Sequence, residues 1–431
     1  MALGIVVVLL LVLLILYPLI LRRGTENAKS TVKEVQSAKA QALAEAAVNR
    51  GLWELQSSGV MFSSAVAGIP LTKFNDDFEF HDLGEGSYKI KISTDPGGNI
   101  VILGKGLEKS GQTSKALQST HQIMMGAVWS IRPVINGIGY PLMPWGVHWG
   151  PIFSNVAIGN NTFLESFPRK YCRGRIPDRD PSMENPPNTD NVEWWDYLTS
   201  LEPPTVDLDY YRDKAKNSTV LAPPSLQWNV VPAIANPPGS GYFPKSANAG
   251  TSVALQLASI LSPTSVIFFD DDTGGGLNSF ANFGFIEAEA LLFNGFSDIY
   301  FSNNIGTVVA TIPVTAPLEY RADPTVWTNA NPPGTGGGPS FDSAFTLNRQ
   351  YTLNNVGLVG FLYSDGNVWD VLSGPVGGKK IVGGVITSRF GGTIAQTGVS
   401  VFYSPEIMAK VRYKKPPPLR LMSRRNISVP Y

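Results

Sequence analysis

The chain opens with an apolar run, Met1 to Leu21, that contains no charged residue and consists largely of leucine, valine and isoleucine. As a helix this run would be roughly 32 Å long, close to the ~30 Å thickness of a bilayer's hydrocarbon core. A cleaved signal peptide is the alternative. Such a peptide normally has basic residues before the run and a small-residue cleavage site after it, whereas Arg22 and Arg23 follow directly here. The pattern therefore predicts a retained membrane helix.

The orientation of this helix poses a conflict. Lysine and arginine are enriched on the cytoplasmic side of membrane helices, so Arg22 and Arg23 would place the C-terminal side in the cytoplasm. The remainder, however, has an extracellular character, being low in lysine and rich in glycine, asparagine, threonine, tryptophan and proline. A short basic leader ahead of Met1, removed on maturation, would resolve the conflict. We therefore expect everything after the helix to lie outside the cell.

Helical character continues beyond the apolar run, from Asn27 to Gln56, without a proline. One helix would then extend from the membrane to about Gln56, roughly 85 Å, with Pro18 and Gly24 as weak points near the membrane boundary. A narrow apolar stripe follows the stem at spacings of three, four or seven residues: Ala28, Val32, Val35, Ala42, Ala46 and Trp53. The stripe needs a surface to cover it, either sibling helices or a β-sheet.

Strand patterns dominate the rest of the chain. Alternating apolar residues predict an antiparallel meander over residues 86–125, whose apolar face would cover the stem helix. Short apolar runs punctuated by glycine or asparagine occur at residues 146–161. They occur again between residues 356 and 408, about every twenty residues. This period favours a β-solenoid, with a β-sandwich as the alternative.

These patterns predict an α+β fold with a long N-terminal helix, an antiparallel β meander packed on it, and a mainly β, solenoid-like body carrying a large loop-rich insertion. The expected parts are a helix at 1–57, a meander at 58–128, a solenoid-like body at 129–164 and 277–408, an inserted proline- and aromatic-rich lobe at 165–276, and an extended basic tail at 409–431. For the tail, a loose terminus and docking onto a neighbouring subunit both stay open.

Composition narrows the classes of function. Lys+Arg and Asp+Glu each total 34, so the net charge is zero and nothing favours nucleic acid as a partner. Charged residues make up only 16%, and the 43 glycines and 33 prolines fit a turn-rich β protein. The single cysteine, Cys172, excludes an internal disulfide framework and any metal site built from several cysteines.

Three segments carry a family resemblance. They are the start MALGIVVVLLLVLLILYPLIL, the alanine-rich QALAEAAVNRGLWELQ, and the strand-like pair GSYKIKIS and NIVILGKG. In their order and spacing, the first 125 residues or so resemble the type IV pilin superfamily, most closely its large minor pilins and the pseudopilins. The resemblance implies a precursor cut by a prepilin peptidase before a hydrophobic first residue, which would make Met1 the mature N-terminus.

The resemblance also identifies a departure at the fifth residue. Pilins usually carry a glutamate there, which can pair with a neighbouring subunit's terminal amine, whereas this chain has Ile5, or Leu9 if cleavage follows Gly4. In the family, loss of that glutamate is associated with a tip-type subunit, so Ile5 argues against a major-subunit role. The residues expected in filament assembly are Met1, Ile5, Leu9, Leu13, Pro18, Val32, Val35, Ala42, Ala46 and Trp53.

Few residue patterns suggest chemistry. Asp270, Asp271 and Asp272, followed by threonine and three glycines, form the densest carboxylate cluster and could bind Ca²⁺; a solvated turn is the alternative. No other cofactor is expected, because the three histidines lie in unrelated contexts. Candidate glycosylation sites are Asn160, Asn217 and Asn426.

The leading hypothesis is therefore a structural subunit, not an enzyme, of an extracellular type IV pilus-like filament. Copies of the chain or related pilins would be its partners through the N-terminal helix, with the membrane as its environment before assembly and surface glycans as a further candidate partner. The alternatives are a tip-located minor pilin or adhesin, and a single-span, surface-anchored β-solenoid that binds carbohydrate or acts as an enzyme. The striped stem favours assembly, because an anchor needs no apolar stripe beyond the bilayer.

Overall fold

The fold is that of a computed structural model of the chain. The structure describes residues 2–96, 98–126, 128–130, 147–148, 152–154, 170–172, 195–197, 203–218, 227–228, 240–244, 252–257, 260–271, 277–283, 285–302, 310–315, 350–370, 380–392, 400–429 and 431. By contacts these fall into two compact units. Unit 1 comprises residues 1–123 and 419–431, and unit 2 comprises residues 124–418.

Unit 1 begins with one helix, α1 (Ala2–Ser57), which runs through both the apolar run and the striped stem, with Pro18 inside it. Its 56 residues correspond to about 84 Å at the usual rise. It ends where Ser58 takes up an extended backbone, and the Ser58 hydroxyl oxygen accepts a hydrogen bond from the Met61 N–H (3.3 Å). This bond caps a short helix, α2 (Gly59–Val66). The predicted single long helix is confirmed.

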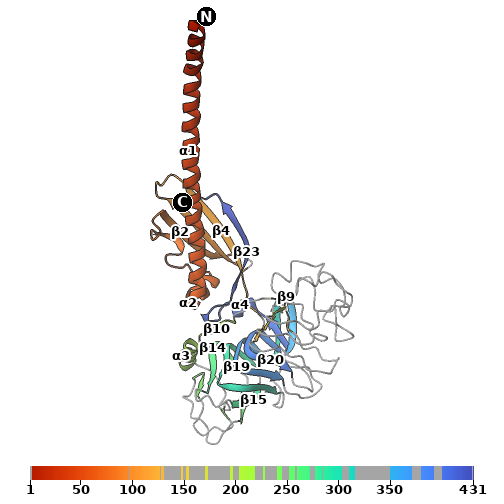
Figure 1. Cartoon of the computed structure of the whole chain (residues 1–431). Helices are drawn as coiled ribbons and strands as arrows, with labels where there is room; N and C mark the ends of the chain where they lie inside the picture. The colour runs from red at the N-terminus through yellow and green to blue at the C-terminus, as the bar shows by residue number, and fades with distance from the viewer. Residues whose placement is uncertain are drawn as a thin grey trace, which may run out of the picture. The chain divides into compact units, whose positions relative to one another are not determined.

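An antiparallel sheet packs on α1, as the alternating pattern predicted (Figure 1). Its strand order is β1-β2-β3-β4-β23. The strands are β1 (Asn75–Phe80), β2 (Gly86–Thr94), β3 (Ile100–Glu108), β4 (Ser114–Ile123) and β23 (Leu419–Ile427). Buried alternate residues of the sheet, Ile90, Ile92, Ile100 and Ile102, form one core with α1. The sheet covers only the C-terminal part of α1, and the N-terminal part extends beyond it (Figure 1).

Unit 2 is inserted between two neighbouring strands of this sheet. Ile123, the last residue of β4, pairs with Leu419, the first residue of β23. One residue further on, the Met124 N–H donates to the Pro418 carbonyl oxygen (2.9 Å). Residues 124–418 thus occupy the position that a tight turn would take in a plain hairpin.

The body of unit 2 consists of two ladders of parallel strands, which is a β-solenoid-like arrangement. The first ladder runs β12 (Tyr242–Pro244), β14 (Ile260–Asp270), β16 (Ile286–Asn294), β19 (Gln350–Asp370), β20 (Lys380–Gly392), β21 (Ser400–Tyr403) and β6 (Val147–His148). The second runs β13 (Ser252–Leu257), β15 (Leu277–Phe283), β17 (Phe296–Ser302), β19, β20, β5 (Val128–Ser130), β7 (Ile152–Ser154), β8 (Lys170–Cys172) and β9 (Trp195–Tyr197).

Strands of neighbouring coils pair in parallel, with register shifts in several of the pairs. Val401 pairs with Ile381, 20 residues before it, and Ile386 pairs with Tyr363, 23 residues before it, which is near the predicted period. Aromatic rings follow the same stacking: Phe243, Phe269 and Phe293 lie ring over ring on β12, β14 and β16, with centroids 4.8 and 5.2 Å apart.

The described residues of unit 2 also form smaller elements. They are β10 (Thr205–Val206) paired with β22 (Tyr413–Lys415), α3 (Leu208–Asn217), β11 (Gln227–Trp228) antiparallel to β13, β18 (Ala310–Thr315) antiparallel to β19, and α4 (Pro405–Met408).

The division of the chain differs from the expected one at two places. Residues 252–257 and 260–270, expected within the inserted lobe, supply β13 and β14 to the parallel ladders. Residues 419–427, expected in the extended tail, form β23 on the chain's own β4. Both differences arise from non-local pairing, which a local composition shift cannot reveal.

Candidate assembly surface

The covered face of α1 is built for very close approach to the sheet. Ala40, Ala44 and Ala47 on α1 are fully buried, and Leu43 is 3% exposed. They face two strand glycines. A Cβ added at Gly104 would lie less than 3.0 Å from the Ala44 carbonyl oxygen, and one at Gly106 would lie equally close to the Ala40 carbonyl oxygen. Glycine is needed at both positions because the helix backbone occupies the space of a side chain.

The sheet leaves most of the predicted apolar stripe uncovered, and Val32 and Val35 lie beside the turn between β3 and β4. Val32 is 55% exposed, Val35 50% and Trp53 62%. Ala42 is exposed as well, and Ala46 is half-buried. The stem helix therefore has two apolar faces. The spacing of apolar residues predicts the uncovered face, but it does not reveal the alanine-rich face that packs on the sheet.

The N-terminal part of α1 exposes large apolar side chains on several sides. Leu10, Leu13 and Leu14 are 58%, 59% and 73% exposed, and Pro18 is exposed too. Met1 and the side chains of Ile5 and Leu9 lie outside what the structure describes. Among the described residues, no helix combines the length and hydropathy of a membrane span.

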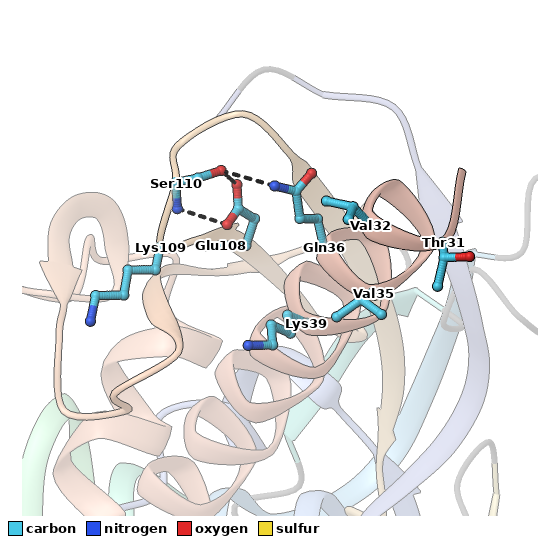
Figure 2. A pocket seen from close by; sticks show the side chains of 8 residues that line it. All are labelled: Thr31, Val32, Val35, Gln36, Lys39, Glu108, Lys109 and Ser110. Carbon is cyan, nitrogen blue, oxygen red and sulfur yellow. Dashed lines mark hydrogen bonds between the residues drawn. The ribbon is translucent and has the colours of Figure 1, made fainter. Parts of the chain in front are cut away.

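A shallow hollow of about 480 Å³ continues the stripe at the turn between β3 and β4 (Figure 2). On the helix side it is lined by Val32, Val35 and Lys39, with Thr31 and Gln36 beside them. On the turn side it is lined by Glu108, Lys109 and Ser110. The Gln36 side-chain amide donates to the Ser110 hydroxyl (3.4 Å), which in turn donates to Glu108. The hollow therefore has an apolar wall and a polar rim.

The carboxylate of Asp270 is held by hydrogen bonds within unit 2. Asp270 ends β14, is 1% exposed, and accepts hydrogen bonds from Arg212 Nε (2.6 Å), Tyr242 (2.9 Å) and Asn294 (2.7 Å). Burial alone would raise the pKa of Asp270, but the hydrogen bonds from Arg212, Asn294 and Tyr242 outweigh it and hold the pKa below its ordinary value. Asp270 therefore does not lie in a solvated turn, which was the alternative predicted from the sequence; it forms a buried ion pair with Arg212.

The other two candidate cation ligands are Asp271 and Asp272. Asp271 is buried, and its backbone N–H donates to the Asn294 carbonyl oxygen (2.8 Å), whereas Asp272 lies outside the described residues. Within the described part of the chain, no three potential ligand side chains come together. Calcium binding stays a prediction.

The candidate glycosylation sites are placed as follows. Asn217 is exposed at the end of α3, where its side-chain amide donates to the Asp213 carbonyl oxygen (2.9 Å). Asn426 is exposed on β23. Asn160 lies outside the described residues. Modification at these sites stays a prediction.

The described parts define an α+β protein in which one long helix packs on an antiparallel sheet and a parallel, solenoid-like β body is inserted between two strands of that sheet. The chain matches no protein-family model and no curated protein. Among solved structures it is similar to the competence-associated pilin ComZ from Thermus thermophilus, with 12% identity over 91% of this chain and 98% of that chain and a TM-score of 0.25. A similarity this low carries no argument about fold or function, which rest on the elements themselves.

Proposed function

We propose that this chain is a structural subunit of an extracellular, type IV pilus-like filament, assembled through α1 with the β body displayed outside. One observation carries the proposal: α1 has two apolar faces, and its own sheet covers only one. The covered face holds Leu43 at 3% exposed, while the other holds Val35 at 50% exposed.

The uncovered surface is too apolar to be stable in water. Burying a leucine or valine side chain contributes about 1.5–3 kcal/mol relative to leaving it exposed. The N-terminal part of α1 alone exposes Leu10, Leu11, Leu13 and Leu14 by about half or more. Lipid would satisfy that part before assembly, and α1 helices of other subunits would satisfy it afterwards. Lipid would not cover Val32, Val35 and Trp53 further along, which favours helix-to-helix assembly over a simple anchor.

Within this proposal the role is structural rather than catalytic, and the subunit would stand at the cell surface. Two ion pairs in unit 2 stabilise its fold: Arg212 binds Asp270, and Lys214 pairs with Glu289 at 2.5 Å. The proposal covers a major or a tip-located subunit, and isoleucine at position 5 argues for the tip-located one.

The test is to image material sheared from cells that express the chain. Wild type should yield filaments, and Val32→Asp combined with Val35→Asp should remove them, because both carboxylates would have to be buried between helices. The matched control is Ser30→Asp with Lys33→Asp, which adds more negative charge to the opposite side of the same helical turns.

We expect the control to retain filaments. A wild-type chain that stays in the membrane as a monomer, without fibres, would overturn the proposal and favour the surface-anchored alternative. Filaments that survive the Val32 and Val35 changes would also overturn it, because the uncovered stripe would then play no part in assembly.

A further inference from the structure

One edge of the unit 1 sheet is long, basic and apolar at its centre. β23 is its outermost strand, and no described strand pairs with its far side. Leu421 and Met422 are 53% and 56% exposed, and Arg424 and Arg425 are exposed beside them. The stretch 409–431 contains several lysines and arginines and no aspartate or glutamate. Proteins rarely leave such an edge uncovered.

The opposite edge of the same sheet has the complementary pattern. β1 presents Phe78, which is 40% exposed, between Asp77 and Glu79. Asp77 accepts hydrogen bonds from the backbone N–H groups of Lys73 (3.4 Å) and Asn75 (3.1 Å), which leave its charge in place. The Lys73 ammonium lies 5.2 Å from the centre of the Phe78 ring and is the cation that a partner would have to displace or share.

A continuous β ladder between the two edges is blocked. β1 has a register shift between Asn75 and Glu79, and Asp76 lies in the left-handed region with a φ of 66°. Two of the backbone N–H groups in this segment are already bonded to Asp77. A bulged edge of this kind contacts a partner through side chains rather than by strand addition.

We propose that β23 of one copy docks against β1 of the next copy, with Leu421 and Met422 on Phe78 and the arginines beside Asp77 and Glu79. The β23 edge has an apolar centre with basic residues around it. The β1 edge has Phe78 between two carboxylates, with Lys73 beside the ring and with Glu79 also accepting a hydrogen bond from the chain's own Tyr431 (3.0 Å). The two edges face away from each other across one sheet, so the contact is head-to-tail and continues from copy to copy.

This inference rests on the proposed filament, which supplies the local concentration that the contact needs. Exposed ion pairs contribute only about 0–1 kcal/mol each, so the edges alone would associate weakly. Copies already held together through α1 meet at a high effective concentration, at which a weak contact is occupied. The arginines would then set the register, and the contact should weaken with added salt.

The first experiment is cysteine crosslinking in sheared filaments, in a Cys172→Ser background. Phe78→Cys and Met422→Cys in one chain should give a ladder of disulfide-linked dimers, trimers and larger species. Gln112→Cys, exposed at the turn between β3 and β4, replaces Phe78→Cys in the matched control and should give no ladder. A dimer from Met422→Cys alone would mean that two β23 edges meet each other, which overturns the proposal.

The second experiment uses charge and needs no cysteine. Arg424→Glu with Arg425→Glu gives a chain that is acidic at both edges, and Asp77→Arg with Glu79→Arg gives one that is basic at both. Each variant alone should yield at least tenfold fewer filaments than wild type, and an equal mixture should recover them, because the two would alternate. An equal mixture that forms no more filaments than the single variants would overturn the inference, and so would single variants that assemble as well as wild type.

The two experiments separate this inference from the proposed function. Wild-type filaments without the crosslinked ladder would overturn the edge contact and leave assembly through α1 standing. A wild-type chain that forms no filaments would overturn the proposed function, and this inference with it.

Discussion

At the residue scale, the close approach of α1 to β3 depends on glycine and alanine rather than on large side chains. Gly104 and Gly106 lie two apart on β3, so both face α1, and the helix backbone at Ala40 and Ala44 rests directly on them. The small residues let helix and strand approach closely, while Ile90 and Ile102 fill the space on either side.

This packing predicts a strong effect from a small change. Gly106→Val should lower the free energy of unfolding of unit 1 by about 2 kcal/mol or more, because the new side chain would displace the helix backbone. Gly84→Ala is the matched control: nothing lies within 4 Å of its added Cβ, and we expect a change within about 0.5 kcal/mol. Urea unfolding followed by circular dichroism measures both, and equal midpoints for the two variants would contradict the close approach.

The buried ion pair in unit 2 predicts a pH dependence. The pKa of Asp270 is lower in the folded chain than its ordinary value of 3.8. Its carboxylate therefore adds stability that is complete above the ordinary pKa and is lost as the pH falls through the folded-state pKa. Asp270→Asn should lower the free energy of unfolding by about 1–3 kcal/mol at about pH 7, because Arg212 loses its buried partner. The loss should become progressively smaller below about pH 4, where the wild-type carboxylate is itself protonated.

Asp209→Asn is the control for that pair, because Asp209 also contacts Arg212 (2.8 Å) but is exposed. We expect it to change the free energy of unfolding by less than about 1 kcal/mol both at about pH 7 and at about pH 3. The measurement is the urea midpoint of each variant and of wild type at these two pH values. An Asp270→Asn penalty that stays constant down to about pH 3 would contradict the assigned role of the carboxylate.

At the element scale, α1 is a helix with two apolar faces that have different partners. One face, with Leu43, belongs to the folding of unit 1, and the other, with Val35, belongs to assembly in our proposal. Hydrophobic spacing alone cannot separate the two, because each repeats at three and four residues. The two faces differ in what covers them. The sheet covers the face with Leu43 and leaves the face with Val35 exposed.

A pair of substitutions on α1 tests this division. Leu43→Asp should destabilise unit 1 by about 3 kcal/mol or more, because it buries a charge against the sheet. Val35→Asp should leave the unfolding of the detergent-extracted chain within about 0.5 kcal/mol of wild type, because the side chain is exposed there. Equal destabilisation by both changes in thermal unfolding would show that the uncovered face also packs within the chain.

At the scale of the whole molecule, unit 2 is an insertion into a hairpin. The ends of unit 1 at Ile123 and Leu419 are already paired, so the sheet does not depend on what lies between them. Replacing residues 124–418 by Asn-Gly should leave a folded unit 1, because this dipeptide closes a two-residue hairpin. Cooperative unfolding of the shortened chain is the expected result.

The control for this deletion also removes residues 419–431, and with them β23 and the contact from Tyr431 to Glu79 (3.0 Å). We expect it to unfold at a lower urea concentration than the hairpin version. A hairpin version that shows no cooperative transition would contradict the independence of unit 1.

The sequence predicted the fold class and the long helix, because both follow from local periodicity over many residues. The roughly twenty-residue period likewise predicted the stacked coils, of which Val401 on Ile381 is one example. The partner of β23 and the place of β14 in a parallel ladder could not be predicted, since both depend on residues far away in the chain. For the candidate site, spacing found Val32 and Val35 but missed the face at Ala40 and Leu43. The Gly-Lys-Gly of β3 beside an alanine-rich helix was the available signal.

The central claim is that other copies cover the exposed stripe of α1. The most direct test is maleimide labelling of Val35→Cys in a Cys172→Ser background, compared between detergent-extracted chain and sheared material, with Gln112→Cys as the exposed reference. We predict rapid labelling of Val35→Cys after extraction and at least tenfold slower labelling in sheared filaments, while Gln112→Cys reacts equally in both. Equal reactivity of Val35→Cys in the two states would contradict the account.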